Sequence, residues 1–159
     1  PALANIFDPI IDRQIGSIRI ASCLEKAVFT QQLSLVDYKK ATSEFAIFIL
    51  SKNVSHDRVI NRVYVSLNKK PSVSVSTTRV LPLVKRDLEF SWKLIEHIHN
   101  HPFFIPLGRT FGGRLAPSPG DILFYKRLFV EMGLKTATIT NGFNSIELTS
   151  YDISALNFN

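Results

Sequence analysis

Residues 97–102 hold three of the four histidines of the chain and end in a proline. Side chains two positions apart on an extended strand point to the same face, so His99 and His101 can present both imidazoles to one ion. Further along, residues 118–121 (Ser-Pro-Gly-Asp) offer the carboxylate of Asp121. Two neutral nitrogens and one carboxylate leave a fourth position for water, as in a catalytic rather than a structural zinc site. The sequence therefore predicts a metal site that performs hydrolysis.

The spacing of these residues resembles the motif of the JAMM zinc metalloproteases, also called the JAB or MPN-plus family. That motif reads His-x-His-Pro, then Ser-x-x-Asp, and is completed by a glutamate well upstream. In this sequence it falls on Glu44, His99, His101, Ser118 and Asp121. The sequence His-Asn-His-Pro, with a later Pro-Ser-Pro, looks most similar to the bacterial RadC-type branch. The resemblance covers residues 40–150 in element order and depends on five specific residues.

The resemblance implies a role for each of these residues. Zinc held by His99, His101 and Asp121 would lower the pKa of its water from about 15.7 toward about 7. Glu44 would accept the proton of that water and pass it to the leaving amine. Ser118, at a helix N-terminus, would donate to the oxyanion that forms on the amide carbonyl. The implied reaction cleaves an isopeptide or peptide bond after the flexible C-terminal tail of a ubiquitin-like protein.

Several of these residues also have a structural interpretation. Ser118 and Asp121 fit an ordinary helix start, where such a pair caps the first turn. Two histidines and a carboxylate are equally the ligand set of non-haem iron oxygenases, although a separate base and a serine favour hydrolysis. Glu25 and Glu96 are alternative candidates for the general base assigned to Glu44. A glutamate is also most often a surface residue without a catalytic role.

The other two histidines are expected outside the ligand set. His97 shares a strand face with His99 and His101, so on spacing alone His97 and His99 could form the pair. The proline after His101 favours the later pair by the motif, and His97 is expected behind the site as a supporting or packing residue. His56 lies in a polar segment and is expected to be exposed.

A 15-residue loop, residues 103–117, separates the two halves of the motif. It is longer than the linker usual in the family, and Phe103-Phe104 stands where Ser-Gly often follows the proline. Its glycines would let an extended peptide pass close to the backbone, which suits substrate binding. Its aromatic residues could equally pack onto the core as a lid, and both interpretations stay open.

Length and composition indicate one globular domain. The chain has 159 residues, 45% of them hydrophobic, which suffices for one complete core. The single cysteine, Cys23, excludes an intrachain disulfide and a thiolate zinc cluster. The longest apolar run, residues 45–50, is far short of the roughly 20 residues of a membrane-spanning helix. Because the sequence begins at Pro1 and its only methionine is Met132, we expect an excised domain or a processed product.

Positive charge is concentrated in one segment. Residues 52–86 contain eight basic residues and one acidic residue, a net charge of +7, while the rest of the chain sums to −1. Such a field attracts phosphates or an acidic protein surface, so a RadC-type module that binds nucleic acid is the second hypothesis. Tyr64 is the only aromatic residue in the segment, which therefore lacks a stacking platform for bases. Solvated strand faces are the structural alternative.

The hydrophobic pattern predicts a single α/β domain with helices packed on a mixed, mostly antiparallel sheet, and the resemblance implies the JAB/MPN, cytidine-deaminase-like layout. A helix should begin at Ser118 and end near Gly133. Further helices are predicted within residues 21–40 and 81–92, and strands at 18–20, 44–50, 59–67, 72–78, 94–101, 136–140 and 145–149. Residues 1–14 are expected to be a leading arm, 15–150 the metalloprotease domain and 151–159 a C-terminal tail.

The sequence thus predicts a zinc-dependent (iso)peptidase that acts on protein tails. The cytoplasm is the expected location, with the protease domain of a secreted bacterial effector or toxin as the alternative. A non-catalytic MPN scaffold is disfavoured because all the motif residues are present.

Overall fold

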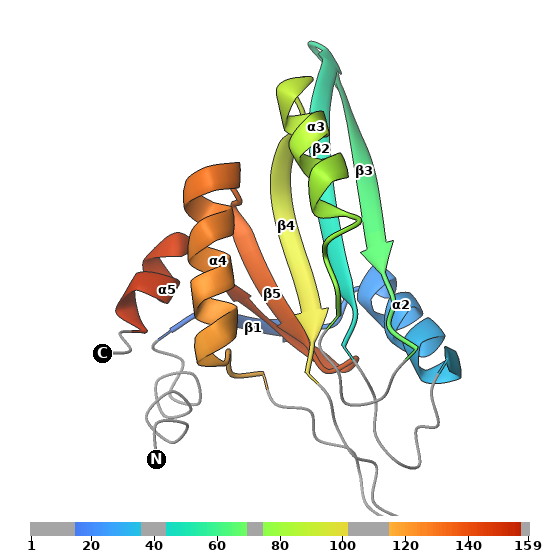
Figure 1. The fold of residues 1–159 in the computed structure, drawn as a ribbon, viewed down its shortest axis with the longest axis vertical. Coiled ribbons are helices and arrows are strands. Elements are labelled where there is room, and N and C mark those ends of the chain that lie inside the picture. The colour runs from blue at the N-terminus through green and yellow to red at the C-terminus, as the bar shows by residue number, and fades with distance from the viewer. Residues whose placement is uncertain (1–14, 36–43, 70–74, 102–114, 157–159) are drawn as a thin grey trace, which may run out of the picture.

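The computed structural model describes residues 15–35, 44–69, 75–101 and 115–156, which form one α/β domain (Figure 1). Within these ranges the strands are β1 (Ser17–Ile20), β2 (Ala46–Ser55), β3 (Arg58–Ser66), β4 (Lys93–Asn100), β5 (Thr136–Thr140) and β6 (Asn144–Leu148). The helices are α2 (Cys23–Leu35), α3 (Leu81–Glu89), α4 (Pro119–Met132) and α5 (Ser150–Ala155). The strands form one six-stranded sheet in the order β1-β6-β5-β4-β2-β3.

The sheet is mixed, as the sequence predicts. Four of its five neighbouring pairs are antiparallel, and only β4 and β5 run parallel. A parallel pair needs a crossover connection, and here the connection includes helix α4. The end of β4 and the start of α4 therefore lie at the same edge of the sheet (Figure 1).

Helices cover both faces of the sheet around β2 and β4. Helices α3, α4 and α5 pack on the front face, where Phe48 and Leu50 of β2 join the larger hydrophobic core. Helix α2 packs on the back face, where Val28 meets Ile47 of β2 and Ile98 of β4. Successive residues of a strand point to opposite faces, so the continuous apolar run of β2 serves both cores. The prediction of a strand covered on both faces is confirmed.

Helix α4 begins and ends as its sequence predicts. Ser118 is the N-cap residue, and its side chain accepts a hydrogen bond from the backbone of Asp121, while the Asp121 side chain accepts one from the backbone of Ser118. Pro119 occupies the first helical position, where its missing N–H costs nothing. Gly133 ends the helix with a φ of 65°, a conformation that glycine adopts readily.

Residues 141–142 (Asn-Gly) between the two predicted C-terminal strands indicate a hairpin, and the structure contains it. Strands β5 and β6 pair in an antiparallel register in which Thr140 lies opposite Ser145. Gly142 has a φ of +84°, and a Cβ atom there would lie 2.9 Å from the Phe29 ring of α2. Both the backbone conformation and the close approach of α2 therefore require glycine at this turn.

Strand β3 pairs with β2 through the turn at residues 56–57. The sequence pattern also predicts a turn at residues 68–71 that leads from this strand into a further strand at 72–78. Residues 75–78 are not in a strand, and residues 70–74 lie outside the described residues. Strand β2 continues to Ser55, five residues past the predicted end. Its last residues are exposed and mostly polar, so no hydrophobic alternation reveals them.

The C-terminal tail was predicted wrongly in part. Residues 150–155 form α5, a single short helix whose N-cap Thr149 makes a second capping box with Asp152. Ile153 and Leu156 are buried in the larger core, so the folded domain continues to residue 156. The predicted leading arm, residues 1–14, and most of the predicted loop, residues 102–114, lie outside the described residues.

Candidate metal centre

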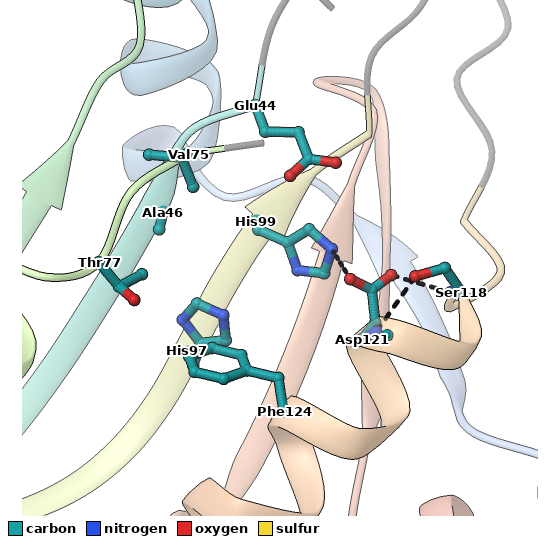
Figure 2. Close-up of a pocket in the computed structure, with 10 residues that line it drawn as sticks. Glu44, Ala46, Val75, Thr77, His97, His99, Ser118, Asp121 and Phe124 are labelled. Atoms are coloured by element: carbon teal, nitrogen blue, oxygen red, sulfur yellow. Dashed lines mark hydrogen bonds and ion pairs between the residues drawn. The ribbon is translucent and has the colours of Figure 1, made fainter. Parts of the chain in front are cut away.

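The sheet places the histidines as the strand periodicity predicts. His97 and His99 point to the front face of β4 and are both buried, whereas His101 lies one residue beyond the end of the strand. His99 is the register partner of Ala46, so the start of β2 lies beside it. Helix α4 approaches from the front and brings Asp121 to the same place (Figure 2). Three segments distant in sequence thus meet at one edge of the sheet.

His99, His101 and Asp121 bring their donor atoms together. The two Nε2 atoms are 3.1 Å apart, and the Asp121 carboxylate lies 2.8 Å from His101 Nε2 and 3.4 Å from His99 Nε2. A tetrahedral zinc with bonds of about 2.0–2.1 Å sets its ligand atoms about 3.3–3.4 Å apart. The His99–His101 and His99–Asp121 distances are within about 0.3 Å of that spacing, and the His101–Asp121 distance is about 0.5–0.6 Å shorter. Among the described residues they form the one group of three or more His, Cys, Asp or Glu side chains that lie close enough to share a metal ion.

The charge state of Asp121 suits a metal ligand. Its burial raises the pKa of the carboxyl group, but hydrogen bonds from His101 and His99 outweigh burial and hold that pKa well below its usual range. The group is therefore an ionised carboxylate at neutral pH. Its Oδ2 also accepts a 2.8 Å hydrogen bond from the backbone N–H of Ser118, which fixes the carboxylate at the helix start.

Ser118 lines the cavity beside Asp121. Its hydroxyl oxygen accepts a 3.1 Å hydrogen bond from the backbone of Asp121, which leaves its own proton able to point into the cavity. The capping interpretation and the catalytic interpretation of Ser118 are therefore compatible, because the cap uses the oxygen and not the proton.

Glu44 lies next to this group without joining it. It precedes β2 by two residues and lines the same cavity, and Figure 2 shows its carboxylate facing His99. Burial raises the pKa of Glu44 above its usual value, although the charges of His99 and His101 oppose the shift. The adjacent backbone is anchored, since the Asn100 side chain accepts a 2.7 Å hydrogen bond from the N–H of Phe45. A half-buried carboxyl group with a raised pKa is suited to exchange protons.

The rival carboxylates lie elsewhere. Glu25 belongs to α2 on the back face, where it pairs with Arg19 at 2.7 Å. Glu96 lies 3.7 Å from the same arginine. Of the three glutamates considered from the sequence, only Glu44 lines the cavity.

The cavity beside the metal group has a volume of about 300 Å³. It is lined by Glu44, Ala46, Val75, Thr77, His97, His99, Ser118, Gly120, Asp121 and Phe124. Figure 2 shows Val75 and Thr77 on one side and Asp121 and Ser118 on the other. The residues that could act on a substrate therefore share one hollow.

His97 is a packing residue, as expected. Its Nδ1 lies 3.1 Å from the carbonyl oxygen of Ile47, and its ring stacks on Phe48 with centroids 4.5 Å apart. Burial lowers the pKa of His97 to about 3, so the ring is neutral at physiological pH. His56 is exposed at the turn between β2 and β3, also as expected.

Tyr125 is the site residue that the sequence analysis missed. Its hydroxyl lies 2.7 Å from Nδ1 of His99, and the side chain is fully buried. Burial, together with the nearby charge of Asp121, raises the pKa of Tyr125 well above its usual value, so the phenol is neutral. Tyr125 follows Asp121 by four residues on α4, so the two share a helix face, but that spacing is equally that of a core aromatic residue.

Part of the basic segment makes structural contacts. The Arg62 guanidinium lies 4.3 Å from the centroid of the Trp92 ring and pairs with Asp87 at 2.6 Å. Lys52 approaches the same ring at 5.9 Å. Two of the eight basic residues therefore contact an aromatic ring of this domain.

Comparisons of the chain with protein-family models, with curated proteins and with solved structures gave no match. Within the described ranges, no helix is both long enough and apolar enough to cross a bilayer. What the site can do is therefore argued from its residues and their geometry.

Proposed function

We propose that the protein is a zinc-dependent hydrolase of amide bonds, an (iso)peptidase of the JAMM type. The observation that supports this most directly is the convergence of His99, His101 and Asp121 within 3.4 Å of one another. A separate carboxyl group, Glu44, and a separate hydroxyl, Ser118, line the same cavity. The coordinating group and the two further residues match the division of labour that metal-assisted hydrolysis requires.

The ligand set fits zinc in its catalytic form. Two imidazoles and one carboxylate are a known ligand set of catalytic zinc, and three protein ligands leave a position for water. When bound, zinc acts as a Lewis acid and lowers the pKa of a coordinated water to about 7. The same ligands suit ferrous iron, but an oxygenase has no evident use for a separate base at the position of Glu44.

The chain's own residues would divide the proton transfers and the charge stabilisation. Glu44 accepts a proton at its carboxylate and returns it to the nitrogen of the leaving amine. The Ser118 hydroxyl donates to the carbonyl oxygen as negative charge develops there, and the positive end of α4 assists. Neutral His97, stacked on Phe48, contributes an uncharged wall to the cavity.

The proposed substrate is the extended tail of a protein, with a ubiquitin-like protein as the first candidate. The cavity is too small for a folded partner, at about 300 Å³. A flexible tail can enter it while the folded part of the substrate stays outside.

The decisive experiment measures bound metal in three purified proteins. The wild-type chain should retain about one zinc per chain after dialysis, and His101→Ala should retain none because one of three ligands is lost. His56→Ala is the matched control, since His56 is exposed at the far hairpin turn, and it should retain the zinc. Absence of zinc from the wild type, or its retention in His101→Ala, would overturn the proposal, and iron in its place would favour an oxygenase.

A further inference from the structure

Strand β3 forms one edge of the six-stranded sheet (Figure 1). Within the described part of the chain its only strand neighbour is β2, so the backbone groups along its outer side do not pair with another strand there. The strand is nine residues long and contains no proline. Natural proteins usually blunt an edge by shortening the strand or by placing proline on it. An edge of this length can therefore accept a further strand.

Three valines of β3 form an apolar strip on the back face of this edge. Val65 is the register partner of Ile47, which packs against α2 on that face, and residues directly opposite in an antiparallel pair share a face. Val63 and Val59 follow at even spacing along the strand, so they point the same way. The exposed fractions of Val59, Val63 and Val65 are 60%, 41% and 39%. This valine strip is therefore apolar surface next to the outer side of β3.

The alternate residues of β3 bring positive charge to the front face. Arg58 and Arg62 each precede a valine of the strip by one position, so they point to the opposite face. Arg62 pairs with Asp87 at 2.6 Å, yet its side chain remains 42% exposed. Asp57 is the only acidic residue of the segment 52–86, which contains eight basic residues. The edge thus combines an apolar back with a basic front, which attracts acidic side chains.

We propose that β3 docks an extended segment of a partner protein in which acidic and apolar side chains alternate. The segment joins the sheet as a further strand, and its backbone bonds to the outer side of β3. Its apolar side chains lie on the valine strip, and its acidic side chains lie beside Arg58 and Arg62, because opposite side chains of paired strands share a face. A second copy of this chain fits less well, since it would bring like charges to the same edge.

This docking surface is independent of the proposed metal site. Strand β2 separates β3 from β4, which carries His99. Neither the valine strip nor the two arginines line the cavity beside the metal group. Binding at β3 therefore needs no zinc, and a failure of the proposed function would leave this inference open to its own test.

The first test measures binding of two synthetic peptides to the metal-free wild-type chain. Both peptides are about ten residues long, the length of a long strand. One alternates valine with glutamate, and the other alternates valine with lysine. Fluorescence anisotropy of a labelled N-terminus gives the Kd. We expect the glutamate peptide to bind at least about tenfold more tightly, because it alone complements the charge of the edge.

Two variants locate the binding on the protein. Val63→Glu places a negative charge in the middle of the valine strip and should raise the Kd of the glutamate peptide about tenfold or more. Val130→Glu is the matched control, because Val130 is 85% exposed on α4 and the change in charge is the same. Its Kd should stay within about twofold of the wild-type value.

Backbone methylation of the glutamate peptide tests for strand addition with the wild-type protein alone. Methyl groups on alternate backbone nitrogens block one side of an extended peptide. One methylated set should therefore abolish binding, and the other should preserve it.

The inference would be overturned if the glutamate peptide did not bind, if both peptides bound equally, or if both methylated sets had the same effect. Equal Kd values for Val63→Glu and Val130→Glu would also contradict it. Self-association of the wild type that Val63→Glu abolishes would make a second copy the occupant instead. Tighter binding of a DNA duplex than of the glutamate peptide at this edge would assign the surface to nucleic acid.

Discussion

Three residues of the candidate metal centre are each fixed by a neighbour that is not itself a ligand. Tyr125 contacts His99, the backbone of Ser118 contacts Asp121, and Asn100 anchors the backbone next to Glu44. Such contacts remove rotamer freedom before an ion or substrate arrives. The site is therefore preorganised by side chains and backbone of the folded sheet and of α4.

Substitution of Glu44 by glutamine should separate catalysis from metal binding. The amide cannot accept a proton, so turnover of a ubiquitin-like protein with an amide-linked C-terminal reporter should fall by about 10²–10⁴-fold. Zinc content should stay at the wild-type level, because Glu44 is not in the ligand group. Glu89→Gln, at an exposed position at the end of α3, is the control and should keep full turnover. Loss of zinc from Glu44→Gln would show that Glu44 is a ligand.

Among single residues, the sequence predicted the convergence of His99, His101 and Asp121, for identifiable reasons. The two-residue spacing of His99 and His101 and the cap pattern around Asp121 are local, so the backbone geometry of one strand and one helix start suffices. Placing Glu44 required the register of β2 against β4, which only the resemblance suggested. Tyr125 could not be distinguished from a core aromatic of an amphipathic helix, because its hydroxyl partner comes from another element.

Two helices of this domain begin with the same kind of N-terminal cap, a capping box. Ser118 and Asp121 open α4, and Thr149 and Asp152 open α5, each pair forming a complete capping box. Only the first box lies at the cavity. The chain therefore contains its own control for the contribution of capping to stability.

Alanine at Ser118 and at Thr149 should cost a similar free energy of unfolding, about 1 kcal/mol each, because each change removes one N-cap side chain. Urea titrations of the two variants would measure this cost. The turnover should differ between them: Ser118→Ala should lose about 10²–10³-fold if its hydroxyl donates to the oxyanion, and Thr149→Ala should lose none. Both should retain zinc, since the Ser118 backbone N–H that holds Asp121 is kept. Equal turnover would leave Ser118 with a capping role only.

Element boundaries were predictable where a pattern or a cap marks them. Helix α4 and the β5–β6 hairpin have such signals in Ser118, Gly133 and Gly142. The far end of β2 has none, because it pairs with β3 beyond Lys93, the first residue of β4, and faces solvent. Helix α5 spans six residues, which is too short for a helical period to emerge from sequence.

At the scale of the whole domain, two polar clusters of the described residues lie on opposite faces of the sheet. The metal group lies in front, whereas Arg19 at the back contacts three carboxylates, those of Glu25, Glu96 and Glu147, at 2.7, 3.7 and 2.6 Å. One guanidinium cannot neutralise three negative charges. Burial raises the pKa of Glu96 to about 7, and the neighbouring Glu25 and Glu147 add to the effect against the attraction of Arg19.

This shift predicts a pH-dependent gain in stability for Glu96→Gln. The folded protein holds the Glu96 proton up to about pH 7, whereas the unfolded chain releases it near pH 4.5, so wild-type stability falls as pH rises through this window. Glutamine cannot ionise, and the variant should be more stable by about 1–3 kcal/mol above pH 7. Below about pH 4.5 the difference should vanish. Thermal melts at pH 4 and pH 8 measure it.

Glu131→Gln is the control for this experiment, because Glu131 is exposed and pairs with Arg127 at 3.9 Å on the outside of α4. Its melting temperature should change by a similar small amount at both pH values. A Glu96→Gln variant that is destabilised at pH 8 would mean that Arg19 needs the third carboxylate.

The single α/β domain and the mixed sheet followed from composition and alternation, because one core of this size admits few layer arrangements. The strand order did not, since the pairing of β3 with β2 depends on a short turn at residues 56–57 without a glycine or proline signal. The placement of the two polar clusters on opposite faces of the sheet depends on that strand order, so it could not be predicted from the sequence either.

The Asp121 carboxylate has two roles: it caps the first turn of α4, and it belongs to the candidate metal group. Thermodynamic reciprocity then applies: whatever the cation gains from an ordered turn, the turn gains from the cation. Fraying at residues 118–121 would weaken ion retention, and saturation with the ion would suppress fraying. Amide exchange of this turn would therefore report occupancy, even without any known substrate.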